Sequence, residues 1–221
     1  MIKKELSIDQ GTWENLLKLG TARKFDPNEI IFFQDQPSSG LVCIKKGKIK
    51  TCMFFPNGKE KIFTFLDAPC FLGETPVIDG GMNTCSAIAI DPTEIVFISR
   101  EDALKFLSEN QGLYMIILRI MATKMRWMHM QVNDMLFPMK QRLAYFLFNY
   151  NDYGVFPNKE MSQKLVIKHD DLANLLGTTR PLITKYLNEF CKSGLIEKSK
   201  GFILIKDYEG LKKLSNADTS R

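Results

Sequence analysis

The chain is poor in the residues from which metal and redox sites are built. It has only two histidines, His129 and His169, and its five cysteines include no C-x-x-C pair. This spacing argues against a zinc ribbon, a disulfide scaffold and a clustered iron–sulfur site. Two histidines are also too few for a multi-histidine site, so we expect no metal ligands.

Signals for export and for membrane insertion are missing too. There is no signal peptide, and no apolar run reaches the roughly 18 residues that a bilayer-spanning helix needs. We therefore expect a cytoplasmic protein that does not contact a membrane. The sequence also shows no nucleophile–base pairing and no phosphate loop. We assign no catalytic residue, and an enzyme is the least favoured class.

Positive charge is present but unevenly distributed. Residues 1–138 hold 16 Lys+Arg and 16 Asp+Glu, whereas residues 139–221 hold 14 and 9, so the whole net charge of +5 lies in the second part. A basic surface supplies the salt-sensitive, sequence-independent part of nucleic-acid affinity. A charged stretch often forms only a solvated face, but the asymmetry favours a nucleic-acid partner.

Residues 168–192 predict two short helices with a tight break between them. Apolar residues recur at helical spacing on both sides of Gly177, which suits a left-handed C-cap. Thr178 or Thr179 suits the next N-cap, and Pro181 suits the first helical turn. This pattern is typical of a helix-turn-helix, although an ordinary helical hairpin shares it. The polar side of the second helix could reach base edges through Thr179, Arg180, Thr184 and Lys185.

The residues that follow favour the helix-turn-helix. Two β-prone runs, residues 195–197 and 202–205, enclose a basic loop over 198–201. This pattern predicts a β-hairpin wing with Lys198 and Lys200 at its tip.

The first half of the chain is rich in short β-prone runs. After a short helix within residues 5–20, such runs occupy 30–33, 41–44, 49–55, 61–65, 86–90 and 94–98. Turn signals separate them, and Asn57-Gly58 is a strong hairpin turn. The pattern predicts an antiparallel barrel or jelly roll, followed by a helix over 100–110.

A long helix is predicted over residues 113–136, and Pro138 ends it. Apolar residues recur along one face at alternating intervals of four and three residues. This is the pattern of a helix that pairs with a second copy of itself. The predicted seam contains Leu118, Met121, Met125, Met128, Val132 and Met135. A neighbouring face could instead be the seam, or could pack on the barrel; it holds Ile117, Ile120, Lys124 and Trp127.

In this order, the parts resemble the CRP/FNR superfamily of bacterial transcription regulators. The resemblance covers nearly the whole chain and rests on residues 71–74, 83–87, 141–144 and 172–187. It implies an α+β fold: an N-terminal antiparallel β jelly-roll sensor domain (1–111), a long dimerisation helix (112–137) and a C-terminal winged helix-turn-helix domain (138–221). It also implies a homodimer on a two-fold-symmetric double-stranded DNA site, with RNA polymerase as a partner if the protein activates transcription. The alternative is a regulatory module that acts on a protein partner.

The resemblance also places an effector region in the barrel. Members that bind cyclic AMP hold the ribose with a Gly-Glu pair and the cyclic phosphate with an Arg-Ser pair. Gly73 and Glu74 match the first pair, but the second falls at Thr84-Cys85 or at Cys85-Ser86, and neither contains an arginine. The positions that meet adenine fall near Trp127 and Met128. We expect an apolar or aromatic effector rather than cyclic AMP, or none, and haem held by His129 or a cysteine is a minor alternative.

By the same resemblance, Arg180 takes the place of an arginine that reads guanine. Pro181 replaces a glutamate that reads cytosine, and Lys185 replaces a second arginine, so the half-site should differ from the best-known one. Residues near the first helix and in the wing should contact phosphates. The complete predicted DNA-binding set is Lys168, His169, Thr178, Thr179, Arg180, Thr184, Lys185, Lys198 and Lys200.

Overall fold

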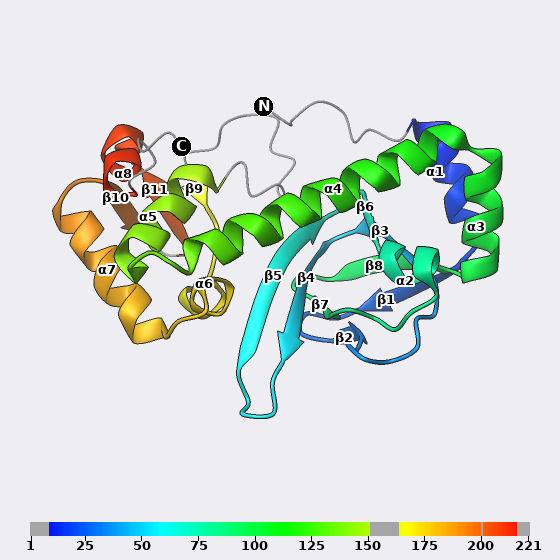
Figure 1. Cartoon of the computed structure of the whole chain (residues 1–221), viewed down its shortest axis with the longest axis horizontal. Helices are drawn as coiled ribbons and strands as arrows, with labels where there is room; N and C mark the ends of the chain where they lie inside the picture. The colour runs from blue at the N-terminus through cyan, green and yellow to red at the C-terminus, as the bar shows by residue number, and fades with distance from the viewer. Residues whose placement is uncertain (1–8, 151–163, 200, 216–221) are drawn as a thin grey trace. The chain divides into compact units, whose positions relative to one another are not determined.

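The computed structural model describes residues 9–150, 164–199 and 201–215 (Figure 1). The chain divides into two compact units: Met1–Phe54 with Phe63–Arg126, and Phe55–Ile62 with Trp127–Arg221. Among the described residues, no helix combines the length and the apolar character that crossing a bilayer requires.

Two antiparallel four-stranded sheets form the body of the first unit, as the β-prone runs predicted. Their strand orders are β1-β8-β3-β6 and β2-β7-β4-β5. The strands are β1 (Thr21–Phe25), β2 (Ile30–Phe32), β3 (Leu41–Lys46), β4 (Lys48–Phe54), β5 (Glu60–Asp67), β6 (Cys70–Leu72), β7 (Ser86–Ala89) and β8 (Thr93–Ile98). Gly58 has φ of 78° in the turn between β4 and β5, as the Asn57-Gly58 signal indicated.

Three elements of this unit were not predicted. Strand β1 is mostly exposed, so it lacks the apolar alternation that marks a half-buried strand. Strand β6 is only three residues long, and helix α2 (Glu74–Asp79) is only six. Elements this short do not show a recognisable period.

Helices close one core of the first unit. These are α1 (Gln10–Leu17), α3 (Arg100–Glu109) and the first part of α4 (Gln111–Asp134). Leu113, Ile117 and Ile120 of α4 pack with residues of α3 and the strands. The Trp13 ring of α1 stacks on Phe71 of β6 with centroids 6.2 Å apart. The apolar face of α4 that contains Ile117 is therefore a core face, one of the two readings left open by the sequence.

The second unit contains the predicted helix-turn-helix. Its helices are α5 (Met139–Asn149), α6 (His169–Leu176), α7 (Arg180–Lys192) and α8 (Tyr208–Leu214). Gly177 ends α6 with φ of 66°, Thr179 is the N-cap of α7, and Pro181 lies in the first turn of α7. The three local signals read from the sequence are all confirmed.

A three-stranded sheet, β10-β11-β9, completes this unit. Its strands are β9 (Lys164–Leu165), β10 (Ile196–Ser199) and β11 (Phe202–Ile205). Ser199 pairs with Phe202, so the wing turn is tighter than predicted, and Lys198 lies in a strand rather than in the loop. The end of this wing strand was missed because β10 has one buried residue, Ile196, followed by three exposed polar residues, so its polar run shows no strand alternation. Lys200 lies outside the described residues.

Candidate DNA-binding surface and effector region

The two helices of the helix-turn-helix pack through apolar faces. Leu172, Ala173, Leu175 and Leu176 of α6 are buried, as are Ile183, Leu187 and Phe190 of α7. The burial of these two apolar faces against each other fixes the orientation of the opposite face of α7. That face is polar, which is the arrangement expected of a helix that enters a major groove.

A shallow hollow runs along the outward face of α7. It is lined by Arg180, Pro181, Thr184, Lys185, Asn188, Glu189 and Lys192. Arg180, Thr184, Asn188 and Lys192 follow one another at intervals of four residues, so they form a single stripe. Sequence reasoning identified the first half of this stripe and missed Asn188 and Lys192, although the same interval of four would have found them.

Arg180 is exposed and lies beside a carboxylate. Its Nη1 is 3.5 Å from Oδ2 of Asp170, and both side chains are more than half exposed. An exposed pair of this kind contributes only about 0–1 kcal/mol. The guanidinium can therefore exchange this partner for a base edge or a phosphate at small cost.

His169 links the two helices of the motif. Its Nδ1 is 3.0 Å from Oγ1 of Thr184, so the predicted phosphate contact and the predicted base contact lie side by side. Burial lowers the pKa of His169, and the positive charges of Lys198 and Arg180 lower it further. The free protein therefore keeps His169 neutral at neutral pH.

A hydrogen bond joins strand β10 of the wing to α7: Lys198 Nζ donates to Oδ1 of Asn188. Lys185 Nζ lies 5.7 Å from the centre of the Tyr186 ring. Lys168 is the N-cap of α6, and Thr178 lies in the turn before the N-cap Thr179. The described residues of the predicted DNA-binding set thus belong to α6, α7, the turn between them and β10.

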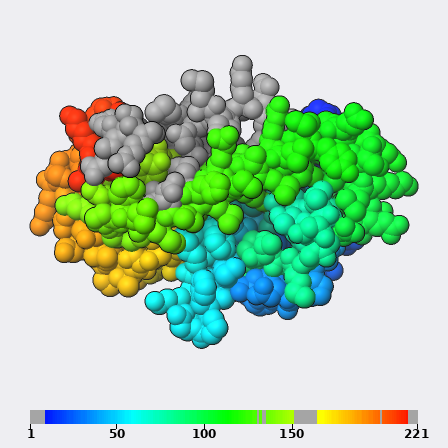
Figure 2. Space-filling view, in the orientation of Figure 1, coloured from blue at the N-terminus to red at the C-terminus, as the bar shows by residue number. Residues whose placement is uncertain are grey.

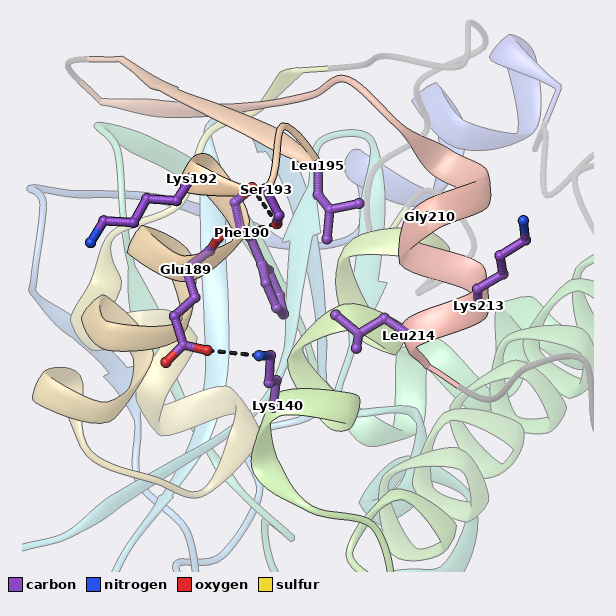
Figure 3. A pocket seen from close by; sticks show the side chains of 9 residues that line it. All are labelled: Lys140, Glu189, Phe190, Lys192, Ser193, Leu195, Gly210, Lys213 and Leu214. Carbon is purple, nitrogen blue, oxygen red and sulfur yellow. Dashed lines mark hydrogen bonds and ion pairs between the residues drawn. The ribbon is translucent and has the colours of Figure 1, made fainter.

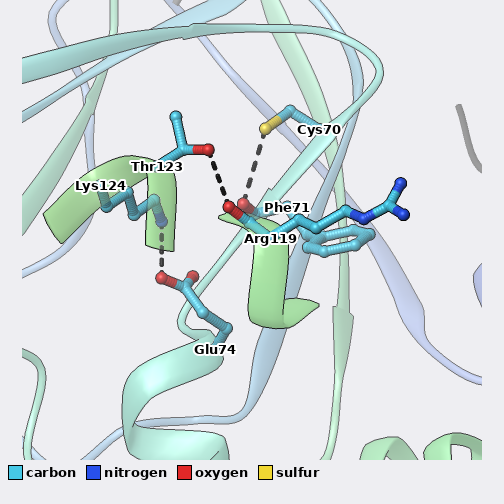
Figure 4. A network of polar contacts seen from close by, with 6 residues as sticks. All are labelled: Cys70, Phe71, Glu74, Arg119, Thr123 and Lys124. Atoms are coloured by element: carbon cyan, nitrogen blue, oxygen red, sulfur yellow. Dashed lines mark hydrogen bonds and ion pairs between the residues drawn. The ribbon is translucent and has the colours of Figure 1, made fainter. Parts of the chain in front are cut away.

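In the first unit, Gly73 and Glu74 form the start of α2. Gly73 has φ of 82°, and a Cβ there would lie 2.7 Å from the carbonyl oxygen of Gly40, so only glycine fits. The Glu74 side chain is 4% exposed, and its Oε1 accepts a hydrogen bond from Lys124 Nζ at 2.7 Å (Figure 4). The other oxygen, Oε2, is buried without a hydrogen-bond partner among the described residues.

Lys124 is a cation that sequence reasoning did not place in this region. Its charge acts on the nearby thiols of Cys70 and Cys85 as well as on Glu74. Burial nevertheless raises the pKa of both thiols, that of Cys70 to about 11, so they stay protonated at neutral pH. The sequence did contain a signal for this lysine: Lys124 lies on the same helical face as Ile117 and Ile120, and that face packs in the core.

The remaining predicted effector residues differ in their exposure. Thr84 is exposed. Trp127 is 9% exposed, whereas Met128 is 60% exposed. Consecutive residues of an α-helix point about 100° apart, so Trp127 and Met128 lie on different faces of α4.

The predicted seam of α4 is an exposed apolar stripe. Leu118, Met125, Met128, Val132 and Met135 are each between 55% and 61% exposed, and Met121 is partly buried. Exposed methionines, leucine and valine in a row are unusual on a solvated helix. The neighbouring face is different, because Ile117, Ile120 and Trp127 are buried within the chain.

The described residues contain no cluster of three or more His, Cys, Asp or Glu side chains that could hold a metal ion. His129 is exposed on α4. The fold defines a class of protein in which an antiparallel β domain precedes a winged helix-turn-helix domain along the chain.

Comparison with known proteins identifies the family. Residues 22–110 match the model of the cyclic nucleotide-binding domain, and residues 141–214 match the Crp-like helix-turn-helix domain. The chain belongs to the CRP/FNR superfamily of transcription regulators. The families it matches are regulators rather than enzymes.

The relatives are distant but extend over most of the chain. The cyclic AMP receptor protein of Thermus thermophilus is 23% identical over 84% of this chain and 83% of its own length. The global nitrogen regulator of Nostoc is 25% identical over 82% of this chain and 83% of its own length. A solved CooA mutant from Carboxydothermus hydrogenoformans shares the fold with a TM-score of 0.77 and 20% identity, over 91% of this chain and 90% of that one.

Proposed function

We propose that the protein acts as a cytoplasmic homodimer that binds a palindromic operator and is controlled by a small effector other than cyclic AMP. The observation that carries the proposal is the outward face of α7, where Arg180, Thr184 and Lys185 line one exposed hollow. The net charge of +5 after residue 138 adds a sequence-independent attraction to the phosphates of DNA. RNA polymerase is the further partner if the protein activates transcription.

Two-fold symmetry is supported by the exposed stripe on α4. Met125 and Met128 would be buried against the same residues of a second chain, as in an isologous interface. Each buried methionine contributes about 1.5–3 kcal/mol, so several of them can hold a dimer together. A dimer presents two copies of α7, and the operator must then contain two inverted half-sites.

The effector proposal rests on the surroundings of Glu74. Some relatives carry names that refer to cyclic AMP. Where the family resemblance implies an Arg-Ser pair for the cyclic phosphate, this chain has Thr84-Cys85 or Cys85-Ser86 and no arginine. The cation at this place, Lys124, is already paired with Glu74 at 2.7 Å. A cyclic nucleotide would have to break this pair and then share one lysine with the carboxylate. An effector with an apolar or aromatic body avoids this competition.

A gel-shift titration tests the DNA-binding proposal. The full-length protein is titrated against genomic fragments at low and at raised salt, with non-specific DNA as competitor. We expect a few fragments to stay bound at raised salt while non-specific complexes dissociate, because base contacts are less salt-sensitive than phosphate contacts. Equal loss of every complex would contradict sequence-specific recognition and favour a protein partner.

A further inference from the structure

A second hollow in the winged helix-turn-helix unit adjoins the end of the DNA-reading stripe, and it shares Glu189 and Lys192 with the hollow along α7. It is an open cleft of about 760 Å³ formed by α5, the end of α7, the segment after α7, and α8 (Figure 3). Its floor contains the side chains of Phe190, Leu195 and Leu214. Two lysines, Lys140 and Lys213, line this cleft and not the hollow along α7.

The walls of the cleft are held firmly. Gly210 of α8 lies so close to Leu195 that a Cβ at Gly210 would come within 2.4 Å of Leu195 Cδ2. Asp207 caps α8 by accepting a hydrogen bond from the Gly210 amide at 2.8 Å. On the other side, Lys140 of α5 binds Glu189 of α7 at 2.8 Å. The cleft is thus a preformed surface feature.

The charge of the cleft is positive. Among its described lining residues Glu189 is the one acid, and Lys140 already neutralises it. Lys192 and Lys213 leave an excess of positive charge around the apolar floor. The space-filling view shows the α5, α7 and α8 surfaces of this unit in green, orange and red (Figure 2).

From these features we propose that the cleft binds an acidic segment of a partner protein whose leucine or phenylalanine side chains lie on the apolar floor and whose carboxylates contact Lys192 and Lys213. An apolar floor with a charged rim is the usual anatomy of a protein interface. Small ligands are normally buried over most of their surface, which an open cleft does not provide. A nucleic-acid backbone offers phosphates but no apolar anchor for Leu195 and Leu214.

The test uses the full-length protein and a labelled synthetic peptide in which glutamates and aspartates alternate with leucines and phenylalanines. Its control peptide has every acid replaced by the corresponding amide. Fluorescence anisotropy measures the binding of both peptides to wild type, to the cleft variant Lys213→Glu and to its matched control Lys212→Glu. Lys212 is adjacent on α8, does not line the cleft, and undergoes the same charge change.

We expect saturable binding of the acidic peptide, and weaker binding of the amide peptide. Lys213→Glu should weaken binding of the acidic peptide about tenfold, because repulsion replaces an attraction, while Lys212→Glu leaves it within about twofold. Absence of binding, or equal loss in both variants, would overturn the proposal. If Lys213→Glu instead weakens binding of all DNA duplexes as strongly as that of the peptide, the cleft is a phosphate-contact surface and the proposal is wrong.

Discussion

At the scale of single residues, Arg180 is the side chain that separates base reading from simple charge attraction. Arg180→Ala should cost about 1–3 kcal/mol per half-site and relax specificity at one base pair, since a guanidinium can bind guanine O6 and N7 together. Competition binding with operators that vary at each position measures both effects.

Lys168→Ala is the control for Arg180→Ala. Lys168 is exposed at the start of α6 and is assigned a phosphate contact, so its loss should weaken all sequences alike and lower the salt dependence. If the two variants change specific and non-specific binding by the same factors, Arg180 does not read a base.

His169 gives the stability of the winged unit a pH dependence. The pKa of His169 is lowered by burial and then by Lys198 and Arg180, so the unfolded chain binds this proton more readily than the folded one. Stability should therefore be full above the unfolded pKa of about 6.5 and fall as pH drops through that value toward the folded pKa. Thermal unfolding on both sides of this pH, compared with His169→Gln, measures the effect.

The His169→Gln variant keeps a hydrogen-bonding group that can reach Thr184 but has no titration in this range. Its stability should lose the part of the pH dependence that belongs to His169. An unchanged slope in the variant would assign the dependence to other groups.

The ion pair between Glu74 and Lys124 is the basis of the effector prediction. A cyclic nucleotide phosphate near Thr84 and Cys85 would compete with Glu74 for Lys124, and burying a charge without a full partner costs several kcal/mol. Every 1.4 kcal/mol is tenfold in affinity, so a micromolar site becomes millimolar or weaker. Calorimetry on ligand-stripped protein should detect no binding of cyclic AMP or cyclic GMP at physiological concentrations.

A micromolar dissociation constant for either nucleotide would contradict the effector prediction. In that case Lys124→Gln should abolish the binding, because Lys124 would be the cation that meets the phosphate. We further predict that any effector contacts Trp127, so its binding should change the fluorescence of wild type and not that of Trp127→Phe after correction for Trp13.

At the scale of elements, α4 has two apolar faces with different neighbours. One joins the core through Leu113, Ile117 and Ile120, and the other is exposed. Met125→Glu places a charge on the exposed face, where it would be buried against its own copy. This variant should shift the protein toward monomer and abolish tight operator binding, as sedimentation and gel shifts would show.

Arg126→Glu is the matched control for Met125→Glu, because Arg126 lies about 100° further round the helix, off the proposed seam. It should sediment as wild type does. An intact dimer for Met125→Glu would remove this face from the interface.

Elements were predictable where a residue has one local role. Gly177 and Pro181 located the turn and the second helix because φ above zero and a missing N–H are tolerated at few positions. Strand β1 was not predicted, since its exposed residues carry no alternation. The Lys124–Glu74 pair was not predicted either, because the two residues are 50 positions apart and no local pattern joins them.

At the scale of the whole molecule, the order of the parts was read correctly because each leaves a different periodicity: two for the strands, near 3.6 for the helices, and 3.5 along α4. The sequence could not state which face of α4 packs inside the chain, since both faces are apolar. Burial of Ile117 and exposure of Met125 in the structure answer that question.

The central claim, that two copies of α7 read one symmetric site, is tested most directly by selecting bound duplexes from a random DNA pool with the full-length protein. We predict enrichment of an inverted repeat whose half-sites lie about 10–10.5 base pairs apart, or a multiple of that spacing, because two recognition helices must reach the same side of the duplex. Enrichment of a single asymmetric half-site, or of no sequence at all, would contradict the account.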